Sequence, residues 1–231
     1  MTATETQARA STAGAAERLL EAATHLFAEQ GYNSVSTRAL TRAAGVNLSA
    51  VTYHFEGKKG LYRAVIERLI SDTEPLRRAL MVELRQGIAA AAGDRGRLGA
   101  VALALVRRLI AMQLSDRFPQ ARFQLMLREV TQPTFAFDRV LSGHVTPVQD
   151  AICELVAAAR GGDPAAAEAK ILAHAIIGQC LMFGIGRPVV LARLGWAEVS
   201  NERLEIVTDT VGRAVLAALG LPHPVGTALE A

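Results

Sequence analysis

Hydroxyl, aromatic and basic side chains are concentrated between Ser36 and Lys59, where the sequence reads STRALTRAAGVNLSAVTYHFEGKK. Hydroxyl groups and cations bind phosphates and base edges, and small side chains let a helix enter the DNA major groove, which is about 12 Å wide. From Gly31 to Arg63 the chain has five basic residues and one acidic residue, a local charge of +4, whereas the whole chain has a net charge of +3. The positive charge is therefore concentrated where a nucleic acid could bind.

Two short helices joined by a tight turn would hold these side chains in place. Ser36 or Thr37 can cap the first helix, and Asn47 can cap the second, which we expect from Leu48 to about His54. Gly45 can adopt the positive φ that the turn needs. The residues expected to pack these helices together and against the first helix of the domain are Leu40, Ala43, Val46, Val51 and Phe55. This pattern is typical of a helix-turn-helix, whose second helix reads the major groove.

We expect the outward face of this second helix, together with Asn47 just before it, to contact DNA. Its members are small, hydroxyl-bearing or aromatic: Leu48, Ser49, Ala50, Thr52, Tyr53 and His54. Lys58 opens the next helix, where free backbone amides favour an anion. The alternative is a helical hairpin with a solvated basic face and no DNA partner.

The remaining periodic stretches also predict helices, and none alternates as a strand would. A first helix is expected over about Ala15–Gln30, with Gly31 as its C-cap, and the helix after Lys58 should turn Leu61, Val65, Ile66 and Leu69 inward. Pro75 should kink or break that helix, and 86–99 is expected as a loop. Further helices are predicted over Leu98–Leu114, Pro119–Thr131, Thr134–Arg160, Pro164–Gly184 and Asn201–Leu219.

Composition and motifs argue against other classes of protein. The chain is 51% hydrophobic and 20% charged, as globular domains are. It has no HExxH, CxxC, phosphate loop or nucleophile elbow, so we expect no enzyme, no metal and no cofactor, although an adaptor that binds only protein remains an alternative. Cys153 and Cys180 are expected as core thiols of a cytoplasmic protein. Met1–Gly14 lacks the apolar core of a signal peptide, and Ile171–Gly186 is too short to span a bilayer.

The helix over Pro164–Gly184 is apolar almost all round, so we expect it to be buried in a core or between the core and a partner chain. Together with Asn201–Leu219 it could form a four-helix bundle with a second copy; alternatively, both helices serve only the subunit core. A homodimer is favoured because two reading helices must meet DNA half-sites about 34 Å apart.

A ligand pocket is expected among the central helices. Its candidate apolar lining is Phe118, Phe123, Met126, Phe135, Phe137, Met182 and Phe183. Arg128 or Arg187 could pair with an acidic ligand, although internal salt bridges or helix-end caps are the alternative for both. His174 is expected to be a satisfied core histidine.

Three motifs, RLLEAATHLFAEQGY, STRALTRAAGV and VTYHFEGKKGLY, make residues 15–70 resemble the N-terminal domain of the TetR family of regulators. The resemblance implies a three-helix DNA-binding domain that works as a dimer. It also implies backbone contacts from Ser36, Thr37 and Arg38 and a phosphate contact from Lys58. Many members have tyrosine at the position of Thr52 and serine at that of Asn47, so an operator cannot be transferred from them.

A second resemblance covers residues 128–196. The pieces REVTQPTFAFDRV, Pro147 and GQCLMFGIGRPVVLARLGW are similar to the CecR-type subgroup, which implies a helical domain for ligand binding and dimerisation and a regulator of transporter or drug-sensitivity genes. We therefore expect an all-α protein with a DNA-binding domain over 13–73 (helix-turn-helix about 36–55), a second domain over 74–220, and flexible tails. The expected function is a cytoplasmic, ligand-responsive repressor that binds palindromic operator DNA as a homodimer and is released or retuned by a small effector.

Overall fold

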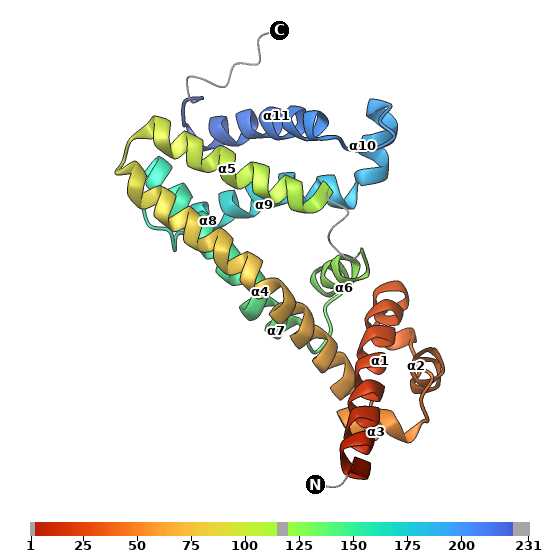
Figure 1. Ribbon diagram of the computed structural model, residues 1–231. Coiled ribbons are helices and arrows are strands. Elements are labelled where there is room, and N and C mark those ends of the chain that lie inside the picture. The colour runs from red at the N-terminus through yellow and green to blue at the C-terminus, as the bar shows by residue number, and fades with distance from the viewer. Residues whose placement is uncertain (1–2, 115–119, 224–231) are drawn as a thin grey trace. The chain divides into compact units, whose positions relative to one another are not determined.

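The computed structural model describes residues 3–114 and 120–223, with side chains from residue 14 on. All secondary structure in these residues is helical, which confirms the all-α prediction (Figure 1). In chain order the elements are α1 (Ala3–Ser34), α2 (Thr37–Ala44), α3 (Ser49–Phe55), α4 (Lys58–Ala91), α5 (Arg95–Leu114), α6 (Gln120–Thr131), α7 (Phe137–Val140), the π-helix η1 (Leu141–Val145), α8 (Thr146–Arg160), α9 (Ala167–Ile185), α10 (Arg187–Leu194) and α11 (Asn201–Leu219).

The described residues form two compact units, and the boundary between them falls after Pro75, within α4. The N-terminal unit comprises residues 3–75 and also 120–144, which the sequence placed in the C-terminal domain. The C-terminal unit comprises residues 76–114 and 145–223. The reason for the difference is that α6 packs against α1 and brings its polar side chains onto that helix.

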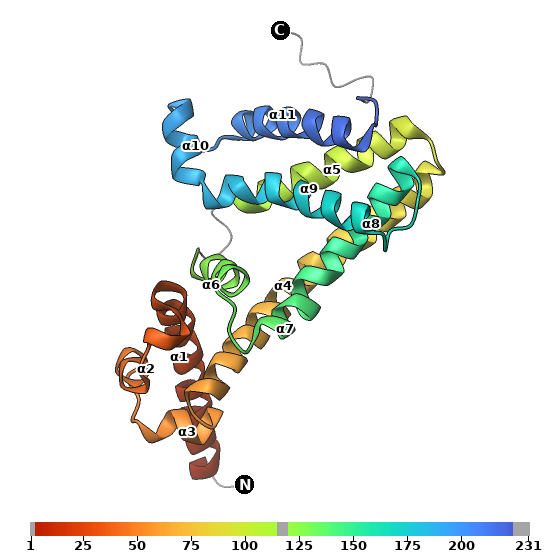
Figure 2. The ribbon, with the colours of Figure 1, turned by 180° about the vertical axis from the view of Figure 1, so that it is seen from behind.

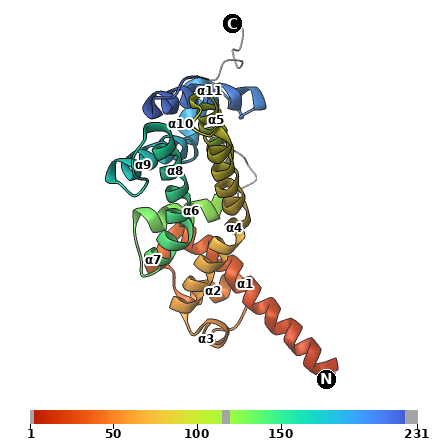
Figure 3. The same cartoon turned by 90° about the vertical axis from the view of Figure 1, so that its left-hand side faces the viewer.

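The core of the N-terminal unit is formed where α1, α2 and α3 meet the first half of α4. The inward stripe of α4 was predicted correctly, because Leu61, Val65, Ile66 and Leu69 are buried. Leu19, Ala23 and Phe27 of α1 are buried as well. Phe27 contacts Tyr62 edge-on, with the ring centroids 4.9 Å apart. Leu125 of α6 and Val140 of α7 are buried in the same unit. In all views α3 and α6 lie toward opposite ends of this unit (Figure 3).

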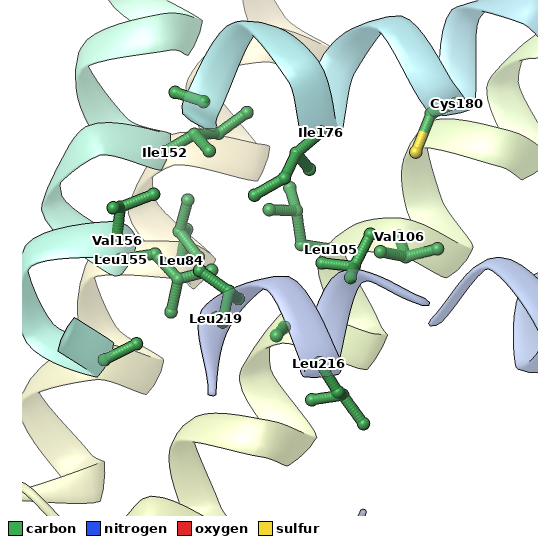
Figure 4. Close-up of a cluster of buried hydrophobic side chains, with 14 of the residues drawn as sticks. Leu84, Leu105, Val106, Ile152, Leu155, Val156, Ile176, Cys180, Leu216 and Leu219 are labelled. Carbon is green, nitrogen blue, oxygen red and sulfur yellow. The ribbon is translucent and has the colours of Figure 1, made fainter. Parts of the chain in front are cut away.

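The core of the C-terminal unit surrounds α5, which packs against α8, α9 and α11 (Figure 2). Figure 4 shows a cluster of buried side chains from these helices and from the second half of α4: Leu84, Leu105, Val106, Ile152, Leu155, Val156, Ile176, Cys180, Leu216 and Leu219. Close-packed aliphatic side chains of this kind supply most of the stability of a helical domain.

One side of α9 faces this core and the other side does not. Ala169, Ala173, Ile176 and Cys180 are buried, whereas the opposite stripe is open, with Ile171 69% and Met182 56% exposed. The stripe consists of Ile171, Ala175, Gly178, Met182 and Ile185. By length and composition α9 passes as a membrane-spanning helix, the one such helix in the described residues, although core helices of soluble proteins pass the same test.

Several element boundaries differ from the prediction. Helix α1 starts at Ala3, earlier than predicted, whereas Gly31 interrupts it with φ 78° and ψ 161° at the predicted helix end, and a short stretch up to Ser34 follows. Helix α4 runs through Pro75 without a break, and the expected 86–99 loop shrinks to residues 92–94 because α4 ends at Ala91 and α5 starts at Arg95. Helix α10 was not predicted, and its start at Arg187 is followed by a proline at a first-turn position, where the missing N–H has no helical partner to lose.

Candidate nucleic-acid interface

Helix α2 is set in place by a cap at each end. The Ala39 N–H donates to Ser36 Oγ at 3.1 Å, and Gly45 ends the helix in the left-handed conformation, with φ 61° and ψ 41°. Both caps were predicted. The Arg18 guanidinium donates to the Ala44 carbonyl at 3.1 Å, which ties the end of α2 to α1. Arg38, on the outer side of α2, is exposed and available to a phosphate.

The turn leads into α3 through a second cap. Asn47 Oδ1 accepts hydrogen bonds from the Ala50 N–H at 3.0 Å and from the Ser49 hydroxyl at 2.9 Å. The predicted capping role of Asn47 is therefore confirmed, and it fixes the orientation of the first turn of α3. The Val46 N–H donates to the Thr41 carbonyl at 3.0 Å, so the turn carries its own backbone bond.

Helix α3 has a buried face and an outer face. Val51 is 1% exposed and Ala50 8%, whereas Leu48 is 53% and Tyr53 77% exposed. Thr52 is also exposed, and His54 is half-buried with its ring 4.9 Å from that of Tyr53. The prediction that Ala50 lies on the DNA-facing side is wrong, because this alanine points into the unit.

The packing prediction for α2 was wrong by one residue. Ala43 is exposed, and Ala44 is buried in its place beside the fully buried Leu40. Residues four apart lie on the same side of a helix, so Leu40 and Ala44 share the inward stripe.

The first turn of α4 abuts the end of α3. A Cβ built on Gly60 would lie 1.7 Å from the Phe55 carbonyl oxygen, so only glycine fits there. Just before it, Glu56 and Gly57 both have positive φ, which turns the chain sharply between the two helices. This close approach fixes the cations at the start of α4 relative to α3.

Three cations of α4 lie against aromatic rings. Lys58 Nζ is 4.4 Å from the Tyr32 ring centroid and donates to the Asn33 carbonyl at 3.4 Å. Partial burial lowers the pKa of the Lys58 ammonium from its ordinary value. Lys59 Nζ and the Arg63 guanidinium lie 4.9 Å and 5.5 Å from the Phe135 ring centroid. These contacts order three cations in the first two turns of α4, the helix that directly follows α3, and cations of this kind can bind the phosphate backbone.

The predicted ligand-binding residues are divided between the two units. Phe118 lies outside the described residues. The N-terminal unit holds Phe123, Met126, Arg128, Phe135 and Phe137, whereas the C-terminal unit holds Met182, Phe183 and Arg187. His174 was expected in the core, but it is exposed, with Nδ1 3.1 Å from the Gln149 amide nitrogen.

The Arg128 side chain caps the end of a helix. Its guanidinium donates to the carbonyls of Ala28 and Glu29 at 3.3 Å and 3.0 Å, directly before the interruption of α1 at Gly31. The alternative of a helix-end cap is therefore the correct one, and pairing with an acidic ligand does not fit this arginine. Arg128 also explains the packing of α6 on α1.

Sequence reasoning missed a buried hydrogen-bond network around Glu129. This carboxylate is fully buried, and it accepts bonds from the Tyr62 hydroxyl at 2.6 Å and from the Thr134 N–H and hydroxyl, both at 2.8 Å. Burial, followed by the bond to Glu129, raises the pKa of Tyr62 well above its ordinary value, so the phenol stays protonated as a donor. The signal in the sequence was the charged pair Arg128 and Glu129 directly after the apolar run Leu125–Leu127.

Two family models match the chain. Residues 19–65 match the model described as bacterial regulatory proteins of the tetR family, and residues 101–220 match that of the C-terminal domain of the HTH-type transcriptional dual regulator CecR. The second match alone covers more than half of the chain. The chain belongs to the TetR family of transcriptional regulators and carries a CecR-type C-terminal domain.

Individual relatives agree with this assignment. The dual regulator CecR of Shigella flexneri is 29% identical over 197 residues, which cover 85% of this chain and 87% of that protein. YttP, described as a probable HTH-type transcriptional regulator of Bacillus subtilis, is 34% identical over 56 residues, or 24% of this chain and 25% of its own. The family acts by binding DNA and is not enzymatic, as the sequence predicted.

Solved structures agree in fold. A TetR-family regulator from Streptomyces coelicolor superposes with a TM-score of 0.53 at 24% identity, covering 95% of this chain and 96% of its own. A transcriptional regulator from Rhodococcus sp. Rha1 gives a TM-score of 0.51 at 20% identity, covering 88% and 96%.

Proposed function

We propose that this regulator is a cytoplasmic homodimer that reads a palindromic operator with α3 and is released or retuned by a small effector, most simply as a repressor. The observation that carries the proposal is the outer face of α3, where Leu48, Thr52 and Tyr53 are exposed next to the cations at the start of α4. A helix whose outer face carries side chains of this kind fits the width of a major groove.

The proposed division of labour separates base contacts from phosphate contacts. Thr52 lies in the exposed middle of α3, and we assign it to base edges. Leu48 is exposed directly before α3 begins, and we assign it to thymine methyl groups. Ser36, Thr37 and Arg38 at the start of α2, together with Tyr53, His54 and Lys58, are assigned to the phosphate backbone. Phosphate contacts position the protein on any sequence, whereas base contacts give preference.

The experiment is a selection of genomic fragments by the purified protein, followed by binding to the recovered site and to random duplex DNA across a salt series. Thr52→Ala should relax preference at one operator position, by about 1–3 kcal/mol of discrimination if its hydroxyl reads a base. Lys58→Ala should weaken binding to all DNA sequences alike, by roughly 1 kcal/mol. Equal losses from both variants on every sequence would refute the division of labour, and no DNA retained at any salt would refute the function.

Dimerisation is proposed through the exposed stripe of α9. Ile171 and Met182 are large, exposed apolar side chains on one face of a helix, while Ala175 and Gly178 between them are small. Small residues let two helices approach closely, and a twofold axis would pair this stripe with its own copy. The case for α11 as part of the same dimer interface is weaker than that for α9, because Val207, Val215 and Leu219 of its stripe are buried in the core of their own subunit.

Gly178→Leu tests the dimer, because a Cβ at Gly178 meets nothing within 4 Å in its own chain. The subunit should fold normally, yet sedimentation should show a monomer with weak operator binding. Ala100→Leu, at an exposed position of α5, is the matched control and should remain dimeric. A Gly178→Leu protein that sediments as a dimer would show that the α9 stripe is not the interface.

The effector is proposed to act by shifting the balance between conformations that do and do not fit the operator, for which a coupling of about 1–3 kcal/mol suffices. The CecR-type C-terminal domain supports a ligand-responsive regulator, and the description of CecR as a dual regulator suggests that the sign of regulation can depend on the site. Phe183, half-buried against the core of the C-terminal unit, is the best-placed of the predicted lining residues there.

A further inference from the structure

The segment after α6 contacts the start of α4 through one aromatic ring. Phe135 is 40% exposed, and its ring packs edge-on against Tyr32 and Tyr62, at 5.1 Å and 5.6 Å between centroids. On the same ring lie the side chains of Lys59 and Arg63, at 4.9 Å and 5.5 Å. A residue from the segment after α6 therefore touches two cations near the start of α4.

Hydrogen bonds fix the position of this ring. Thr134, the residue before Phe135, donates its N–H and its hydroxyl to the buried Glu129 carboxylate, and the hydroxyl oxygen also accepts from the Ala136 N–H at 3.2 Å. Tyr62 donates to the same carboxylate from α4. A buried carboxylate without these donors would be strongly disfavoured, so the segment is held firmly against α4.

We propose that Phe135 is a positioning residue for DNA binding, which holds Lys59 and Arg63 over its ring in the orientation that meets the phosphate backbone. This inference rests on the proposed DNA-binding function. Lysine and arginine lose much rotamer freedom on binding, so side chains that are already ordered bind with a smaller entropic loss. An aromatic face orders a cation through its quadrupole, which an aliphatic side chain of similar size cannot do.

Lys58 provides a contrast within the same turn. Its ammonium lies over the ring of Tyr32 of α1, whereas Lys59 and Arg63 lie over the ring of Phe135. A change at Phe135 should therefore affect Lys59 and Arg63 but leave the binding of Lys58 to phosphate in place. The result expected is a partial loss of DNA affinity, with fewer phosphates neutralised.

The test compares Phe135→Leu, which keeps apolar bulk but removes the ring face, with Phe135→Trp, which keeps the face. The probe is a fluorescein-labelled random-sequence duplex, titrated with full-length protein from low to moderate salt. Phe135→Leu should weaken binding about threefold, as expected for a cation–π contact at an exposed site. It should also reduce the magnitude of the slope of log K against log salt by about 0.9 for each phosphate that the variant no longer neutralises. Phe135→Trp should match the wild type.

A double-mutant comparison separates positioning from folding. In a Lys59→Met, Arg63→Met background, Phe135→Leu should have no further effect, because the cations through which it acts are gone. The same threefold weakening in that background, or an unchanged salt slope, would mean that Phe135 is only structural and would overturn the inference. Failure of the wild-type protein to bind the duplex would instead reject the DNA-binding function itself.

Discussion

The contact of Gly60 with Phe55 gives a sharp test of how α3 is held. In Gly60→Ala the new Cβ would stand 1.7 Å from the Phe55 carbonyl oxygen, whereas real Cβ atoms essentially never approach closer than 3.0 Å. The obstacle is backbone, so the α3–α4 turn itself must move by more than 1 Å. Alanine gains about 0.8–1 kcal/mol over glycine from helix propensity, but overpacking typically costs about 1–3 kcal/mol and sometimes more. Because backbone cannot yield as a side chain can, we expect a net destabilisation of about 1–2 kcal/mol.

Gly87→Ala, in the same helix, is the matched control. There the new Cβ would meet side-chain atoms only, Val101 Cγ2 at 2.9 Å and Cγ1 at 3.3 Å. Valine is stiff at χ1, so the two helices must shift by a few tenths of an ångström, a cost that the helix propensity of alanine offsets, and we expect a change within about 1 kcal/mol. Thermal unfolding followed by circular dichroism should give a midpoint roughly 2–8 °C lower for Gly60→Ala than for wild type. Binding to random duplex DNA should weaken as well, because α3 and the cations of α4 no longer keep their spacing. A melting midpoint of Gly60→Ala that equals or exceeds that of Gly87→Ala would refute the reasoning.

Two further predictions concern a helix cap and a thiol. Ser36→Ala should cost about 1 kcal/mol of stability, because α2 loses its N-cap. Ser36→Asp should restore the melting midpoint but still weaken DNA binding, because its carboxylate would repel phosphates. Equal DNA affinities for Ser36→Asp and wild type would place Ser36 away from DNA. Burial raises the pKa of Cys180 to about 12, so its contribution to stability is intact below pH 9 and is lost as the pH rises from about 9 toward 12. Iodoacetamide at pH 8 should therefore leave Cys180 unmodified in the native protein and label it in urea, as mass spectrometry of the peptide would report; rapid labelling without urea would contradict its burial.

Local chemistry made the DNA-binding motif predictable. The Ser36 cap, the left-handed Gly45, the Asn47 cap and the buried Val51 all follow from residues within a few positions of one another. The errors at Ala43 and Ala50 are of one kind: on short helices, a shift of one residue in the assumed facing is enough to place a small side chain on the wrong side.

The packing of α6 could not be predicted in this way. Arg128 binds the carbonyl of Glu29, which is 99 positions away in the chain, and Glu129 binds Tyr62 at a separation of 67. No period or cap signal in the sequence connects such residues. The charged pair Arg128 and Glu129, directly after the apolar run Leu125–Leu127, indicated only that these side chains need polar partners somewhere in the fold.

The hydrogen bond from Ser49 to Asn47 limits which nucleotide this serine can select. Its single hydroxyl hydrogen is already directed at the Asn47 amide oxygen, so toward a groove it offers lone pairs and no hydrogen of its own. Among the major-groove edges, only the amino groups of adenine and cytosine supply a hydrogen, whereas guanine and the thymine carbonyl present lone pairs. If Ser49 contacts a base of the operator, that base should therefore be adenine or cytosine.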